Sequence, residues 1–147
     1  MTMTTTPTRN AHHSEAEAIA HAANLPPITM TQGDWERLGS LAEAATEIFP
    51  RTADFLTREV ERAQVVAAPA RPSEFVTMGS TVDFQDDITA QVRRVTLVYP
   101  EEADVGTGKV SVLTPVGAAL IGLSPGQSID FQTPSGGWRS LTLLKIV

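Results

Sequence analysis

Hydrophobic residues recur at three- and four-residue steps in two neighbouring stretches of the chain, which is the pattern of amphipathic helices. The first stretch follows Thr31, a predicted N-cap with Asp34 at capping-box spacing. Its apolar stripe consists of Trp35, Leu38, Leu41, Ala42, Ala45 and Ile48. A stripe of this kind predicts a helix with one hydrophobic face available for packing.

The second stretch runs from Thr52 to Val66, after Pro50, which ends the first helix or begins the next. Its apolar face is formed by Leu56, Val60, Ala63 and Ala67, with Phe55 beside them. The residues predicted to face solvent are Arg58, Glu59, Glu61 and Arg62. Two striped helices with a short connection predict an antiparallel helical hairpin.

The helical pattern disappears beyond a Pro- and Ala-rich linker at residues 69–72. Polar and apolar residues then alternate, most clearly over residues 91–99, as expected of half-buried strands. Thr114 and Pro115 suit the N-cap and first residue of a short helix, which Gly122 would end. Further strands are predicted at residues 81–84, 110–113, 128–132 and 138–147. The fold class is therefore α+β, with a short N-terminal antiparallel helical hairpin followed by a compact antiparallel sheet with one short helix.

These changes of pattern divide the chain into three segments. We predict a flexible tail at residues 1–27, the helical hairpin at residues 28–68 and a globular domain at residues 73–147. The tail holds all three histidines, but no carboxylate cluster accompanies them at metal-ligand spacing. A solvated tail is therefore predicted in preference to a metal site.

Composition removes several classes of function. The 147 residues include no Cys, 11 Lys+Arg and 17 Asp+Glu, for a net charge of −6. The lack of Cys excludes disulfides and thiolate zinc sites, and the lack of a long apolar run argues against a transmembrane helix. The acidic balance disfavours a broad surface that neutralises DNA phosphates. We expect a cytoplasmic protein with no membrane contact and no direct specific nucleic-acid readout.

The predicted folded part carries little catalytic chemistry, because it has neither Cys nor His. The segment from Gly106 to Lys109 lacks the spacing of a phosphate-binding loop. Asp83, Asp86 and Asp87 lack the pattern of an EF-hand calcium loop. Trp35 and Trp138 fall within patterned elements, which favours positions in or beside the core. The sequence therefore predicts a binding module and not an enzyme, with no catalytic residue, metal or cofactor.

Five short motifs, in order, resemble a known family. Residues 76–84 (VTMGSTVDF), residues 110–123 (VSVLTPVGAALIGL) and the turn between Gly126 and Gly136 resemble the carboxy-terminal domain of bacterial Gre transcription elongation factors. The segments RAQ at residues 62–64 and TLVYP at residues 96–100 are closer to a short-armed subfamily, the regulator of nucleoside diphosphate kinase.

This resemblance implies an FKBP-like carboxy-terminal domain, an amino-terminal coiled-coil arm and docking at the rim of the secondary channel of RNA polymerase. In Gre factors, acidic residues at the arm tip help to hold a catalytic magnesium for transcript cleavage. Here the arm is short, and the carboxylates near its tip are Glu43, Glu47 and Asp54. We therefore expect a transcription regulator that binds the polymerase and competes with other channel factors, without stimulating transcript cleavage.

The resemblance also implies which residues face the polymerase. The positions that match the rim contact of Gre factors are Ser111, Leu113, Thr114 and Pro115. Thr114 and Pro115 are equally explained as a helix cap. Two further functions stay open: a regulator that acts on another protein, such as nucleoside diphosphate kinase, and an FKBP-like prolyl isomerase.

Overall fold

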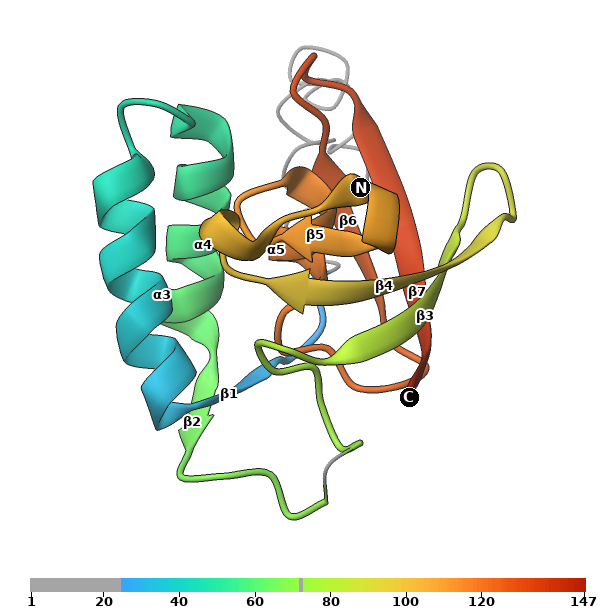
Figure 1. Cartoon of the computed structure of the whole chain (residues 1–147), viewed down its shortest axis with the longest axis horizontal. Coiled ribbons are helices and arrows are strands. Elements are labelled where there is room, and N and C mark those ends of the chain that lie inside the picture. Colours follow the sequence, from blue (N-terminus) through green and yellow to red (C-terminus); the bar gives the residue numbers. More distant parts are fainter. Residues whose placement is uncertain (1–24, 72) are drawn as a thin grey trace, which may run out of the picture.

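Two helices form the first layer of the fold. The computed structural model describes residues 25–71 and 73–147, so the predicted tail lies almost wholly outside the described residues. Helix α3 spans Gln32–Ala45 and helix α4 spans Pro50–Arg62. Thr31 caps α3, since its hydroxyl accepts a hydrogen bond of 3.1 Å from the amide of Asp34. Figure 1 shows α4 between α3 and the rest of the molecule.

The start of α3 lies beside the end of α4. The indole Nε1 of Trp35 donates a 3.0 Å hydrogen bond to the carbonyl oxygen of Val60. A Cβ placed on Gly39 would lie 3.8 Å from a methyl group of Val60, which is ordinary contact. The two helices and residues 46–49 between them are called the helix pair below.

A two-stranded parallel sheet closes the base of the helix pair, and no local pattern predicted it. Strand β1 spans Thr29–Thr31 and strand β2 spans Gln64–Val66, with Thr29 opposite Gln64. The prediction that the second helix continues to Val66 is therefore wrong. Ala63 takes up an extended backbone conformation, and the next amide, that of Gln64, donates to the carbonyl of Ile28 at 2.9 Å.

Two side chains of the helix pair differ from their predicted positions. Ile48 is 73% exposed, because α3 ends at Ala45 and Ile48 falls in the turn beyond it. Glu59 was predicted to face solvent but is 0% exposed. Its carboxylate is paired with Arg62, with nitrogen–oxygen distances of 2.7 and 2.9 Å, and Arg62 also donates to the carbonyl of Pro26.

The second layer is a curled five-stranded sheet with the order β5-β4-β3-β7-β6 (Figure 1). Its strands are β3 (Thr81–Asp86), β4 (Val92–Val98), β5 (Lys109–Ser111), β6 (Ser128–Gln132) and β7 (Trp138–Ile146). Strand β4 confirms the strand predicted at residues 91–99. The sheet is mixed, and not antiparallel throughout as predicted, because β5 pairs in parallel with β4. Two 3₁₀ turns, η1 (Pro100–Glu102) and η2 (Val105–Thr107), lie between these two strands.

One hydrophobic core joins the two layers. Helix α5 (Pro115–Leu120), predicted from its Thr-Pro start, contributes three buried apolar side chains to it. The core also includes Leu38 and Leu56 from the helix pair and Leu97 and Leu143 from the sheet. Since α4 packs against the same core as the sheet, the helix pair is anchored to the globular part along α4.

Candidate protein-docking site

The segment from Ser111 to Pro115 connects β5 to α5 in a tight turn held by its own side chains. The Thr114 hydroxyl accepts a 3.1 Å hydrogen bond from the amide of Gly117, as an N-cap does. The same hydroxyl donates to the carbonyl of Ser111 at 2.7 Å. The Ser111 hydroxyl in turn accepts from the amide of Leu113 at 3.0 Å. Three side-chain hydrogen bonds therefore fix the shape of the turn.

Gly117 allows α5 to approach this turn closely. A Cβ at this position would lie only 2.1 Å from the carbonyl oxygen of Ser111. No side chain fits there without a movement of the backbone. The glycine is therefore a packing requirement of the turn, a role that the sequence alone did not reveal.

A cavity of about 530 Å³ opens beside this turn, against the core face of the sheet. Ser111, Thr114 and Pro115 line it, whereas Leu113 does not. Ser111 is buried, and Leu113 is half-buried with its side chain packed against the core. The four predicted contact residues are therefore together in space, but only Thr114 and Pro115 are half-exposed at this cavity.

The walls of this cavity, which we call the basic groove, combine apolar and cationic groups. Phe84, Val95 and Phe131 are its buried aromatic and aliphatic residues. Its charged residues are one acid, Asp86, and four bases: Arg93, Arg94, Lys109 and Arg139. The groove is thus positive in a protein with a net charge of −6. Sequence reasoning missed it, because its basic residues come from separate strands that are adjacent only after folding.

Hydrogen bonds and ion pairs stabilise the ionised state of two carboxylates, Asp86 and Asp83. Hydrogen bonds from the amides of Thr89 and Ile88, and then from Arg139, hold the pKa of Asp86 below its ordinary value. The guanidinium of Arg94, at 2.7 Å, lowers the pKa of Asp83 in the same way. Arg94 and Arg139 are therefore engaged within the protein.

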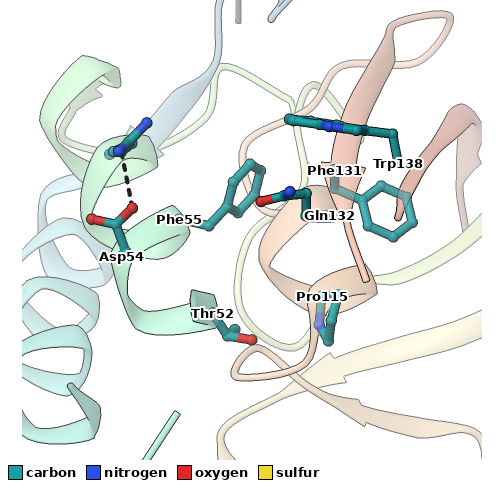
Figure 2. Close-up of a pocket in the computed structure, with 8 residues that line it drawn as sticks. Thr52, Asp54, Phe55, Pro115, Phe131, Gln132 and Trp138 are labelled. Carbon is teal, nitrogen blue, oxygen red and sulfur yellow. Dashed lines mark ion pairs between the residues drawn. The ribbon is translucent and has the colours of Figure 1, made fainter. Parts of the chain in front are cut away.

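A smaller cavity of about 310 Å³ lies between α4 and the sheet, and Pro115 belongs to both cavities. Figure 2 shows Phe55 pointing from α4 toward Gln132 and Trp138, while Asp54 points the other way. Trp138 is 39% exposed. The prediction that Trp138 lies in or beside the core is therefore wrong, because its side chain is exposed at the wall of the cavity.

The predicted tip carboxylates do not gather at one point. Glu43 and Glu47 are exposed at the end of α3 and in the following turn. Asp54 lies one turn into α4 and forms a 3.1 Å ion pair with Arg58. Among residues 25–71 and 73–147, no three His, Cys, Asp or Glu side chains come together in a way that could hold a metal ion.

No helix in the described part of the chain is long and apolar enough to cross a membrane.

Comparison with known proteins assigns both layers of the structure. Residues 71–147 match the family described as "Transcription elongation factor, GreA/GreB, C-term", and residues 26–66 match "Rnk N-terminus". The chain is 37% identical over 121 residues to the regulator of nucleoside diphosphate kinase of Escherichia coli (strain K12), with 82% of this chain and 89% of the relative covered. It is 47% identical over 68 residues to the elongation factor GreA of Syntrophobacter fumaroxidans, which covers 46% of this chain and 43% of that protein.

A solved structure supports the same assignment. The prokaryotic transcription elongation factor GreA/GreB from Nitrosomonas europaea superposes with a TM-score of 0.63 at 37% identity. The match covers 82% of this chain and 98% of that one. These relatives are named as regulators or elongation factors. The chain thus belongs to the GreA/GreB transcription elongation factor family and carries an Rnk-type amino-terminal region.

Proposed function

We propose that this protein binds RNA polymerase at the rim of its secondary channel, in the cytoplasm. It competes there with other channel factors and does not stimulate transcript cleavage. Family membership supports a polymerase-related role. The observation that carries the docking proposal is the basic groove, which opens directly beside Thr114 and Pro115.

We further propose that the two parts of the chain have different roles. Residues 28–68 form a short antiparallel helical hairpin that serves as the arm. Residues 73–147 form a globular domain with an FKBP-like sheet. The arm carries no catalytic group, and the globular domain carries the docking surface.

The charge and the apolar walls of the groove indicate the kind of protein segment that it binds. Lys109 and Arg93 are exposed basic residues at its wall, beside the buried Phe84 and Val95. A positive rim around apolar walls is complementary to an acidic segment that also presents an apolar side chain. Charges at such a rim act mainly on the rate of association and on its salt dependence. We therefore expect the polymerase to present an acidic segment to this groove.

The dimensions of the helix pair support the absence of cleavage stimulation. Helix α3 has 14 residues, and at about 1.5 Å per residue it is about 21 Å long. Glu43 at the end of α3 and Glu47 in the following turn are not joined by Asp54, which is paired with Arg58. A short arm without a carboxylate cluster occupies the mouth of a channel and supplies no ligands to a distant magnesium ion.

The test is binding to purified bacterial RNA polymerase core by interferometry, with a long-armed Gre factor as competitor. We expect binding that the competitor displaces, and no cleavage of the transcript in a stalled complex. Absence of binding at micromolar protein would overturn the proposal. Cleavage above background would overturn the part concerning the arm.

Two substitutions locate the contact. Leu113→Asp places a charge in the predicted contact segment, and Lys109→Glu reverses a charge at the exposed wall of the groove. Each is expected to weaken binding by about tenfold, which corresponds to about 1.4 kcal/mol. Lys145→Glu is the matched control, because Lys145 is exposed and does not line the groove. Since Leu113 packs against the core, circular dichroism must show that its variant is folded.

A second function is favoured by the name of one relative, the regulator of nucleoside diphosphate kinase. In that case the protein would act directly on the kinase. Kinase activity measured with and without a stoichiometric amount of this protein separates the two functions. A direct change in kinase rate, together with no polymerase binding, would replace the first proposal by the second.

A further inference from the structure

The small cavity between α4 and the sheet is a separate feature from the basic groove. It has a volume of about 310 Å³, at the lower end of the range for ligand pockets, which is about 300–1,000 Å³. Three of its walls are aromatic: Phe55 from α4, Phe131 from β6 and Trp138 from β7 (Figure 2). Pro115 completes the lining at the first residue of α5. A volume of this size can hold one large side chain.

The charges around this cavity cancel. Asp54 and Arg58, its charged lining residues, form an ion pair with one another at 3.1 Å. The amide nitrogen of Gln132 already donates to the carbonyl of Gly136 at 3.1 Å. The cavity therefore lacks the unpaired cation that a phosphate or carboxylate would require, in contrast to the basic groove. Its aromatic walls favour an uncharged apolar group.

The cavity is continuous with the proposed docking surface, because Pro115 lines both the cavity and the basic groove. A partner that covers Pro115 therefore contacts the lining of both cavities. Interfaces of this kind concentrate their binding energy in a few apolar anchors that fill desolvated pockets.

We propose that the cavity between α4 and β6–β7 receives a single large apolar side chain of RNA polymerase. This inference rests on the proposed function and adds a second anchor to it, next to the basic groove. The inserted side chain contacts α4 and β7 at once. Docking of the globular part therefore also fixes the helix pair.

A single thiol tests occupancy of the cavity, since the chain contains no cysteine. Thr52→Cys places a thiol of nearly the same size on the α4 wall. The variant Thr89→Cys is the matched control, because Thr89 is exposed in the β3–β4 loop and lines neither cavity. Modification by a maleimide is followed by mass spectrometry of this chain, with and without polymerase core. We expect polymerase to slow modification of the Thr52→Cys thiol by about tenfold, a protection that follows from exclusion of solvent around an anchor, and to leave the control unchanged.

Filling the cavity tests whether its occupancy contributes to affinity. Thr52→Trp inserts a large side chain from α4, and Thr52→Leu inserts a smaller one that folds more readily. Polymerase binding is expected to weaken by about tenfold with Trp, equal to about 1.4 kcal/mol, and by less with Leu. Thr89→Trp provides the control. Thermal melting by circular dichroism identifies any variant that is not folded.

The outcomes separate this inference from the proposed function. If the unaltered protein does not bind polymerase, the proposed function fails, and this inference fails with it. If the unaltered protein binds but the Thr52→Cys thiol stays reactive, or both filling variants bind as well as the unaltered protein, only this inference is overturned. Protection of the thiol without polymerase, rising with protein concentration, would assign the cavity to a second copy of the chain and would also overturn it.

Discussion

Replacement of Gly117 by alanine tests how closely α5 approaches the Ser111 turn. The added Cβ would lie 2.1 Å from the Ser111 carbonyl oxygen and 2.9 Å from both the Ser111 carbonyl carbon and the Val112 Cα. All three atoms belong to the backbone, so the overlap cannot be relieved by rotation of a side chain. Overpacking costs about 1–3 kcal/mol, and we take the upper end because the turn itself must move. Alanine in a helix recovers about 1 kcal/mol relative to glycine, which leaves a net loss of about 2 kcal/mol.

The assay is urea unfolding followed by circular dichroism, with linear extrapolation to water. Gly33→Ala is the matched control, because Gly33 is the second residue of α3 and has no atom within 4 Å of its added Cβ. That control should raise the free energy of unfolding by about 0.4–1 kcal/mol. The two substitutions are thus expected to have opposite signs. The reasoning is refuted if Gly117→Ala is as stable as the unaltered protein.

Two further predictions concern the cap of α5 and the buried acid of α4. Thr114→Ala should lower the free energy of unfolding by about 1 kcal/mol, the usual value of an N-cap, whereas Thr114→Ser should retain most of it in the same urea assay. Burial raises the pKa of Glu59 above its ordinary 4.5, in spite of Arg62, so the folded state binds that proton more tightly than the unfolded state does. On acidification from neutral pH, stability should therefore first rise as Glu59 is protonated. At pH values below 3.8, the ordinary pKa of an aspartate side chain, stability should then decrease, because Asp83 and Asp86 lose their charge. Unfolding midpoints measured from neutral to acid pH check this order, and Glu59→Gln should abolish only the first rise.

The sequence correctly predicted those helices and strands that are determined by residues close together in the chain. The Thr31 cap begins α3 where the sequence indicates it, and Thr114 with Pro115 begins α5 in the same way. The alternation over residues 91–99 appears as β4. In each case the residues that define the element are neighbours in the sequence.

The features that escaped prediction depend on residues far apart in the chain. Strand β2 exists because Gln64–Val66 pairs with a segment 35 positions earlier, and nothing within β2 reveals its partner. Glu59 is buried in contact with Arg62, and Arg62 also donates to the carbonyl of Pro26, 36 positions earlier. The basic groove combines Arg93 of β4, Lys109 of β5 and Arg139 of β7, each of which is an ordinary charged residue in the sequence. The spacing of charged residues along the sequence does not show which of them lie together in the folded protein.

The parallel pairing of β1 with β2 has a consequence for how such proteins can be altered. It holds the entrance and the exit of the helix pair side by side. Residues can therefore be inserted in matched numbers at the far end, around the exposed turn at residues 46–49, without changing the register of either strand. The length of the helix pair can therefore be varied without changing the globular part. Chimaeras that carry helix pairs of different length on one globular base would show what this length contributes to polymerase binding, with the proposed docking surface held constant.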